Sequence, residues 1–387
     1  MSRRKPRLTT PKTQPKTQKP LSTLQTEKSE IPELSVTARI VNQLDWDLLW
    51  ERFGIAVVTV VVWFIAGLAT PGFANVDNFV SFLRQSAFVG VSAVGMTIAI
   101  IAGTFDLSVG ATQALCAWIA VSVAKIAGVF PAFLAAVAVG GVVGLCNGSL
   151  VALVRIPAFI ATLGTMFLVN GLTYIITNGQ TARFSGKSFV WWGNAQIMSV
   201  PIPFIVFLSC ALLGAAMLHR TEFGRFVYAI GSNREAANIA GVPVAKVAIF
   251  VFVVVGLFTG LGAMLLGARL YSAGPGLEPG FELNVIATVV LGGTRLAGGR
   301  GSMLGTVAAA ILFATLANVL NLNHVDAFVQ RVVVGLVLLL ALSVEGVRQR
   351  LAEYWSRRSV SARHPLGGRR SAVAAIESIK KPGVNRN

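Results

Sequence analysis

The stretch PAFLAAVAVGGVVGLCNGSLVALV, residues 131–154, contains no charged residue. As an α-helix it is long enough to cross the roughly 30 Å hydrocarbon layer of a bilayer. Gly140, Gly144 and Gly148 recur at four-residue spacing, so they share one helix face, where a second backbone can approach closely. The stretch therefore predicts a membrane-spanning helix that packs tightly against a neighbour.

Similar apolar stretches flank it on both sides. With 54% hydrophobic and 13% charged residues, the 387-residue chain has a composition that soluble domains do not reach. We predict an all-α, polytopic membrane protein with about ten transmembrane helices, some broken at glycine clusters. The eighth apolar stretch is short, which predicts a broken or partial helix there. The expected spans are residues 53–69, 84–103, 108–127, 131–154, 158–178, 201–218, 247–269, 283–297, 302–322 and 326–345.

Basic residues supply the expected orientation, because Lys and Arg accumulate in cytoplasmic loops. If residues 1–45 and 348–387 form basic cytoplasmic tails around a transmembrane domain at 46–347, all but six of the 33 Lys and Arg lie inside. The net charge of +17 thus gathers at the ends and not on a nucleic-acid-binding face. We expect a multi-pass protein of the bacterial inner membrane, in contact with lipid. The six exceptions are Arg84, Lys125, Arg183, Lys187, Arg269 and Arg331.

The sequence lacks the motifs of an ATP-hydrolysing enzyme. Its nearest approach to a phosphate-binding loop is residues 184–188, where Gly186 and Lys187 follow Thr181 in place of the required first glycine. The three cysteines and three histidines have no metal-ligand spacing. We therefore expect no catalytic residue, no metal and no cofactor.

The polar loop at 219–246 is expected on the cytoplasmic side. Ser232-Asn233-Arg234-Glu235 has the pattern of a capping box, which predicts a helix of about eight residues that stops at Gly241. Its surface is mostly small, with Ala236 and Ala237. Such a helix suits insertion into a groove on a partner protein, although an ordinary connecting helix on the membrane surface is an open alternative.

Two glycine-rich breaks interrupt the apolar pattern, at 102–110 and 291–302. Within the first, Asp106 or Ser108 either caps the following helix or acts in a gate. Other neutral polar residues are candidates for a solute pathway, with hydrogen bonding between helices as the alternative for each. These pathway candidates are Gln113, Asn147, Thr162, Thr165, Asn170 and Asn318.

Two other functions compete with a partner-driven transporter. A gradient-driven carrier usually needs ionisable residues at mid-membrane, and here they lie near the borders. A membrane-embedded enzyme needs clustered acids at one face, whereas the expected topology puts Asp106 and Glu282 on opposite sides.

From about Asn78 to Arg348 the chain resembles the permease subunits of bacterial ATP-binding-cassette importers for ribose, xylose, arabinose and related monosaccharides. Four stretches, in the family's order, carry the resemblance. They are residues 95–97 leading into 106–110, residues 156–165, residues 224–231 leading into the capped helix, and residues 292–294 with 298–302.

This resemblance implies a division of labour. The family's permeases form homodimers, receive substrate from a periplasmic solute-binding protein and are driven by a cytoplasmic ATP-binding subunit. The helix at Ser232 to Gly241 corresponds to the family's coupling element. Two departures concern the solute: Thr104 and Phe105 replace a common glycine and small aliphatic residue, and Asn170 replaces a common arginine. The family also includes importers of small polyols and is distantly similar to branched-chain amino acid permeases.

Overall fold

The computed structural model describes residues 46–326 and isolated positions between 328 and 343. It divides the chain at Trp46, and every helix and strand below belongs to the unit that runs from Asp47 onward, apart from the first residue of α2. The expected tails at 1–45 and 348–387 lie outside the described residues. Half of the tenth expected span, 326–345, lies outside them as well.

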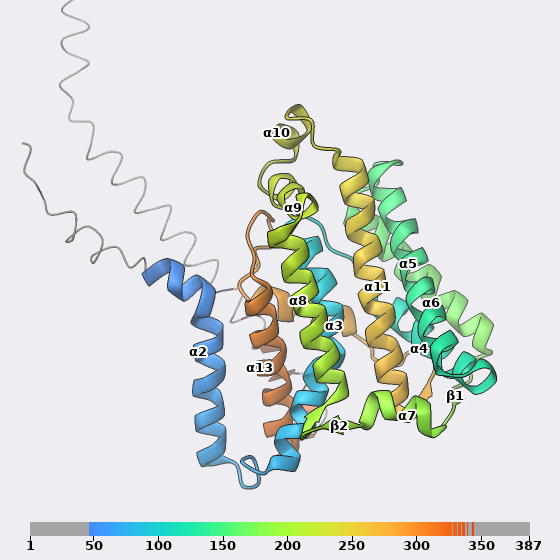
Figure 1. The fold of residues 1–387 in the computed structure, drawn as a ribbon, viewed down its shortest axis with the longest axis vertical. Helices are drawn as coiled ribbons and strands as arrows, with labels where there is room; N and C mark the ends of the chain where they lie inside the picture. Colours follow the sequence, from blue (N-terminus) through green and yellow to red (C-terminus); the bar gives the residue numbers. More distant parts are fainter. Residues whose placement is uncertain are drawn as a thin grey trace, which may run out of the picture. The chain divides into compact units, whose positions relative to one another are not determined.

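The described chain is helical, with a few two-residue strands (Figure 1). Within the described residues, seven helices are long and apolar enough to cross a membrane. The prediction of an all-helical polytopic membrane protein is therefore confirmed. The seven helices are α3 (Val76–Ile101), α4 (Val109–Ala127), α5 (Val129–Ala152), α6 (Ala158–Thr177), α8 (Ile202–Arg220), α11 (Val244–Leu270) and α13 (Met303–Leu322).

Two further apolar helices correspond to the first and eighth expected spans. Helix α2 covers Trp46–Ala69, and α12 covers Phe281–Leu291. With 11 residues, α12 is too short to cross the hydrocarbon layer at 1.5 Å per residue, as expected for a partial helix. Helix α3 begins well before the expected residue 84, because the Asn75 side chain accepts a hydrogen bond from the Asp77 N–H and caps it there.

Helix α11 lies at the centre of the bundle, between α3, α4 and α5 (Figure 1). Its closest approach is to α5, where glycines of both helices meet backbone: a methyl group at Gly140 would overlap the Gly256 carbonyl, and one at Gly144 would overlap the Phe252 carbonyl. This confirms the tight packing predicted from the glycine spacing.

The outer faces of the bundle are apolar. The most apolar windows of α5 and α6 are each only 22% buried, and their outward side chains are large and hydrophobic. Cys146 belongs to this exposed face of α5, whereas Cys116 and Cys210 are buried. Such faces are typical of helices that meet lipid or another membrane-embedded surface.

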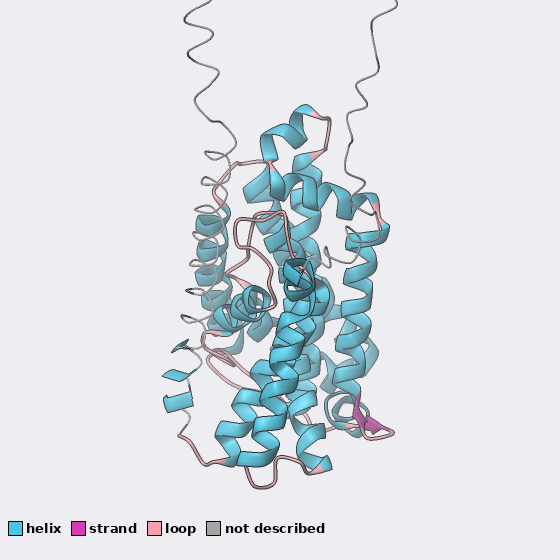
Figure 2. Cartoon of the chain, turned by 90° about the vertical axis from the view of Figure 1, so that its left-hand side faces the viewer, coloured by secondary structure: helices cyan, strands magenta, loops and turns pink. Residues whose placement is uncertain are grey.

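The two ends of the bundle carry different short elements (Figures 1 and 2). One end, called the α10 end here, carries α9 (Glu222–Ser232) and α10 (Arg234–Ile239). The other, called the α7 end, carries α7 (Lys187–Asn194) and four strands. These are β1 (Ala182–Arg183) antiparallel to β4 (Ser272–Ala273), and β2 (Gln196–Ile197) antiparallel to β3 (Val200–Pro201).

Candidate coupling and pathway sites

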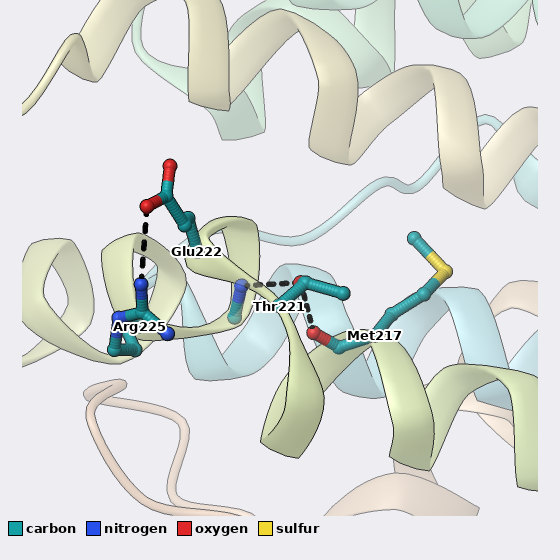
Figure 3. A network of polar contacts seen from close by, with 5 residues as sticks. Met217, Thr221, Glu222 and Arg225 are labelled. Atoms are coloured by element: carbon teal, nitrogen blue, oxygen red, sulfur yellow. Dashed lines mark hydrogen bonds and ion pairs between the residues drawn. The ribbon is translucent and has the colours of Figure 1, made fainter.

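The chain leaves α8 through a side-chain cap at Thr221 (Figure 3). The Thr221 hydroxyl accepts a hydrogen bond from the Gly224 N–H at 3.2 Å and donates to the Met217 carbonyl. Glu222 forms a 3.3 Å ion pair with Arg225 on the following turn. A threonine followed by a glutamate is a known sequence signal for the start of a helix. We did not predict α9, although this signal was present in the sequence.

The predicted capping box at Ser232 is wrong. Ser232 is the last residue of α9, and its hydroxyl donates at 2.8 Å to the Tyr228 carbonyl within that helix. Asn233 instead caps α10, because its side-chain oxygen accepts from the Ala236 N–H at 2.9 Å. Helix α10 is therefore a six-residue turn and not a helix of about eight residues.

The surface of α10 is mostly polar and exposed. Of the predicted coupling residues, Ala237 is buried against the bundle, and the others are on the surface. The large apolar Ile239 is 81% exposed. An exposed isoleucine among polar neighbours is suited to contact with another protein. The exposed coupling residues are Ser232, Asn233, Arg234, Glu235, Ala236 and Gly241; Ser232 belongs to α9.

Three of the predicted pathway residues meet in one buried cluster between the α3–α4 connection and α5. Asp106 Oδ1 accepts from the Ser108 N–H at 2.8 Å and from its hydroxyl at 2.6 Å. Asn147 Nδ2 donates to Asp106 Oδ2 at 3.0 Å and to the Ser108 hydroxyl at 2.9 Å. All three residues are buried, so the cluster ties the first glycine-rich break to α5.

Burial also sets the electrostatics of this cluster. It raises the pKa of Asp106, while the hydrogen bonds from Ser108 and Asn147 oppose the rise. Of the two expected caps, Ser108 occupies the N-cap position of α4 but makes no side-chain capping bond there. Asp106 receives the Ser108 N–H instead, so the aspartate orders the turn that leads into α4.

The other polar candidates do not join this cluster: three lie on α6, and Asn318 lies on α13. Thr162 donates to the Ala158 carbonyl of its own helix at 2.8 Å. Asn318 forms a reciprocal amide pair with Asn78, with distances of 2.7 and 2.9 Å, which links α13 to α3. Thr165 and Asn170 are half-buried on α6.

Gln113 differs from these residues, because it is 1% exposed and neither of its amide atoms has a partner within the described chain.

The placement of Asp106 and Glu282 on opposite sides is wrong. A methyl group at Gly110 would overlap the Glu282 carboxylate, so Glu282 lies against the first turn of α4. The reason is that the partial helix α12 begins beside α4 and not at the far end of the bundle. Within the described residues, no three metal-ligating side chains of His, Cys, Asp or Glu gather in one place.

The α7 end carries a pocket of about 570 Å³ beside the β1–β4 pair. Arg183 and Ser185 line it from one side of the pair, and Tyr271 and Ser272 line it from the other. Nearby, Trp191 and Trp192 contact each other edge to face on α7. The pocket therefore presents a guanidinium and hydroxyl groups at the end of the bundle opposite α10.

A bundle of lipid-compatible helices, with polar breaks inside it and a capped polar element at one end, defines a polytopic membrane transport protein. Comparisons with known proteins give the family. A family model described as the permease component of a branched-chain amino acid transport system matches residues 78–342. The chain belongs to this family, so it is a transport component of a bacterial ATP-binding-cassette importer and not itself an ATPase.

Its curated relatives include sugar permeases. The chain is 37% identical over 306 residues to the ribose import permease protein of Escherichia coli strain K12, covering 78% of this chain and 95% of the relative. It is 36% identical to the Bacillus subtilis ribose import permease protein, covering 79% and 95%. It is 35% identical to the L-arabinose transport system permease protein of Escherichia coli strain K12, covering 78% and 92%. No solved structure matches the chain.

Proposed function

We propose that this chain is the membrane-spanning subunit of an ATP-driven importer that moves a monosaccharide into the cytoplasm. The observation that carries the proposal is the capped α9–α10 pair, which presents the exposed Ile239 among polar groups at one end of a membrane bundle. A separate ATP-binding subunit docks there. The sugar assignment rests on the ribose and arabinose permeases among its relatives.

We further propose ten crossings with both termini in the cytoplasm. The α10 end then faces the cytoplasm, in keeping with Arg220, Arg225, Arg234 and Lys246 around it. The α7 end faces outward. Residues 1–45 and 348–387 form the basic tails of this arrangement and meet anionic lipid at the inner surface.

A periplasmic solute-binding protein delivers the sugar to the α7 end. The pocket lined by Arg183 and Tyr271 offers hydrogen-bond donors there, and Lys187 lies close by in sequence. An acidic group on the delivering protein would complement this surface. A second copy of the chain and membrane lipid cover the apolar faces of the bundle, of which α5 and α6 are the least buried.

The broken segments are the moving parts in this proposal. ATP-driven closure of the partner pushes on α10, and the connections at 102–108 and 292–302 let neighbouring helices tilt between outward-open and inward-open states. The Asp106, Ser108 and Asn147 cluster fixes the first of these connections to α5. Gln113, Thr162, Thr165, Asn170 and Asn318 remain the proposed polar residues of the pathway region.

Co-purification tests the docking surface. The tagged chain, expressed with its ATP-binding subunit and extracted in detergent, is expected to carry ATP hydrolysis with it. Ile239→Asp puts a charge into the proposed contact and should lower the co-purified activity by about tenfold or more. Met198→Asp is the matched control, because Met198 is 96% exposed but lies at the α7 end.

Transport in liposomes decides between the alternatives. Uptake of labelled ribose or arabinose that needs ATP, the ATP-binding subunit and the binding protein supports the proposal. Uptake by the chain alone down an ion gradient would instead make it a secondary carrier. Competition by a branched-chain amino acid or a small polyol, but not by either sugar, would reassign the solute.

A further inference from the structure

Three glycine-containing segments that are far apart in sequence meet at the α10 end. They are the end of α3 with residues 102–103, the last turn of α9, and the α12–α13 connection at 292–302. The Gly299 N–H donates to the Ile101 carbonyl at 2.9 Å. A methyl group at Gly298 would lie 2.8 Å from the Gly103 Cα and 3.0 Å from the Gly231 carbonyl oxygen. We call this contact the glycine junction.

Gly231 of α9 lies at the centre of the glycine junction. A methyl group there would overlap the Ile101 carbonyl oxygen and would lie 2.5 Å from the Gly299 nitrogen. Both neighbours are backbone, so no side-chain rotation can make room. Gly298 and Gly299 have φ values of +86° and +74°, which only glycine adopts readily. The close approach and the backbone conformation therefore both require glycine.

A hydrogen bond also joins α9 to the α12–α13 connection. The Tyr228 hydroxyl, one turn before Ser232, donates to the Gly301 carbonyl at 3.3 Å. In the other direction, α9 passes directly into α10 through the Asn233 cap. Figure 1 shows α9 at this end of the bundle, between α10 and the membrane-spanning helices. Helix α9 thus lies between the proposed docking surface and both broken segments.

We infer that Gly231 is a positioning residue that transmits displacement of α10 to the two breaks in the membrane bundle. This inference rests on the proposed function, in which a partner pushes on α10. Contacts between side chains can absorb small shifts by changing rotamer, whereas backbone packed on backbone cannot. A shift of α9 must therefore move the end of α3 and the start of α13 together. The glycine junction thus makes both breaks respond to the same displacement of α10.

The test separates hydrolysis from transport in the complete importer. The chain, its ATP-binding subunit and its solute-binding protein are reconstituted in liposomes, and ATP hydrolysis and uptake of labelled ribose and arabinose are measured together. Gly231→Ala should keep the ATP-binding subunit and its hydrolysis but import about tenfold less sugar per ATP, since overpacking at this contact displaces the backbone. Gly67→Ala is the control, because a methyl group there meets nothing within 4 Å.

The outcomes are distinguishable. If wild type neither retains an ATP-binding subunit nor imports either sugar, the proposed function fails. If wild type works and Gly231→Ala imports as much sugar per ATP as Gly67→Ala, the inference about Gly231 is overturned.

If Gly231→Ala does not accumulate in the membrane, Tyr228→Phe is tested in its place. This substitution removes only the hydroxyl that donates to the Gly301 carbonyl. A lowered sugar-to-ATP ratio in that variant, with normal thermal stability in detergent, supports transmission. An unchanged ratio overturns it.

Discussion

The Asp106 carboxylate depends on one amide from another helix. Asn147 donates to it at 3.0 Å, and its other donors come from the adjacent Ser108. Asn147→Leu leaves a buried acceptor without a partner, which costs on the order of 1–3 kcal/mol. We expect Asn147→Leu to have a lower Tm in detergent, measured from tryptophan fluorescence as the protein is heated. Cys146→Leu, on the exposed face of the same helix, should leave Tm almost unchanged.

The effect of pH on this deficit has a definite sign. Burial raises the pKa of Asp106 in the folded protein. The contribution of Asp106 to folding stability is therefore present below the pKa that it has in the unfolded chain, and is lost as pH rises through the pKa that it has in the folded protein. The Asn147 hydrogen bond opposes that rise, so its removal raises the pKa further. The Tm deficit of Asn147→Leu should therefore widen from about pH 4 to about pH 8. A deficit that narrows over this range would contradict the assignment.

At the same scale, the cap of α10 shows what sequence reasoning missed. Ser232 and Glu235 have the spacing of a capping box, but Ser232 already bonds the Tyr228 carbonyl at the end of α9. The pattern locates the start of α10 to within one residue, and Asn233 takes the role. The error follows from not predicting α9, since a residue that closes one helix is not free to open the next.

Among the elements, the contact between α5 and α11 gives the sharpest stability prediction. Alanine favours a helix over glycine by up to about 1 kcal/mol, so Gly→Ala stabilises where space allows. At Gly144 the added methyl overlaps the Phe252 carbonyl and forces the two helices apart. Gly144→Ala should therefore lower Tm in detergent despite its better propensity.

Gly164 of α6 supplies the matched comparison, because a methyl group there meets nothing within 4 Å. Gly164→Ala should leave Tm unchanged or raise it slightly. Equal effects of the two substitutions would mean that the α5–α11 contact is looser than the structure has it.

Hydropathy predicted the long helices well for a physical reason. A membrane span must be a continuous apolar helix, so a single window of sequence is enough to detect it. Where α12 lies was not predictable in this way. Its 11 residues are apolar like the others, but its position beside Gly110 depends on how the preceding loop packs. Partial helices are set by tertiary contacts that no single window contains.

For the whole molecule, the sequence predicted the separate glycine-rich breaks but not their convergence. Ile101, Gly231 and Gly299 come from three distant segments, and their contact is made by backbone atoms that leave no side-chain pattern. The glycines themselves were visible as a composition signal. The need for them is a close approach between segments, which appears only once the helices are packed.

The orientation of the whole chain is testable by cysteine accessibility. Single cysteines are introduced at Met198, Ile239 and Ser356 in a background with the three native cysteines replaced by alanine. Met198 and Ile239 are well exposed, at opposite ends of the bundle, and Ser356 follows the tenth expected span. A membrane-impermeant maleimide is then added to right-side-out vesicles, before and after permeabilisation.

With ten crossings and both termini inside, Met198→Cys should react in intact vesicles, while Ile239→Cys and Ser356→Cys should react only after permeabilisation. Reaction of Ile239→Cys from outside would mean that the orientation of the chain is inverted. Helix α10 would then be out of reach of a cytoplasmic ATP-binding subunit. Reaction of Ser356→Cys as well as Met198→Cys in intact vesicles, with Ile239→Cys still protected, would leave the docking end in place but make the number of crossings between Ile239 and Ser356 odd. The three sites together therefore separate an error in orientation from an error in the helix count.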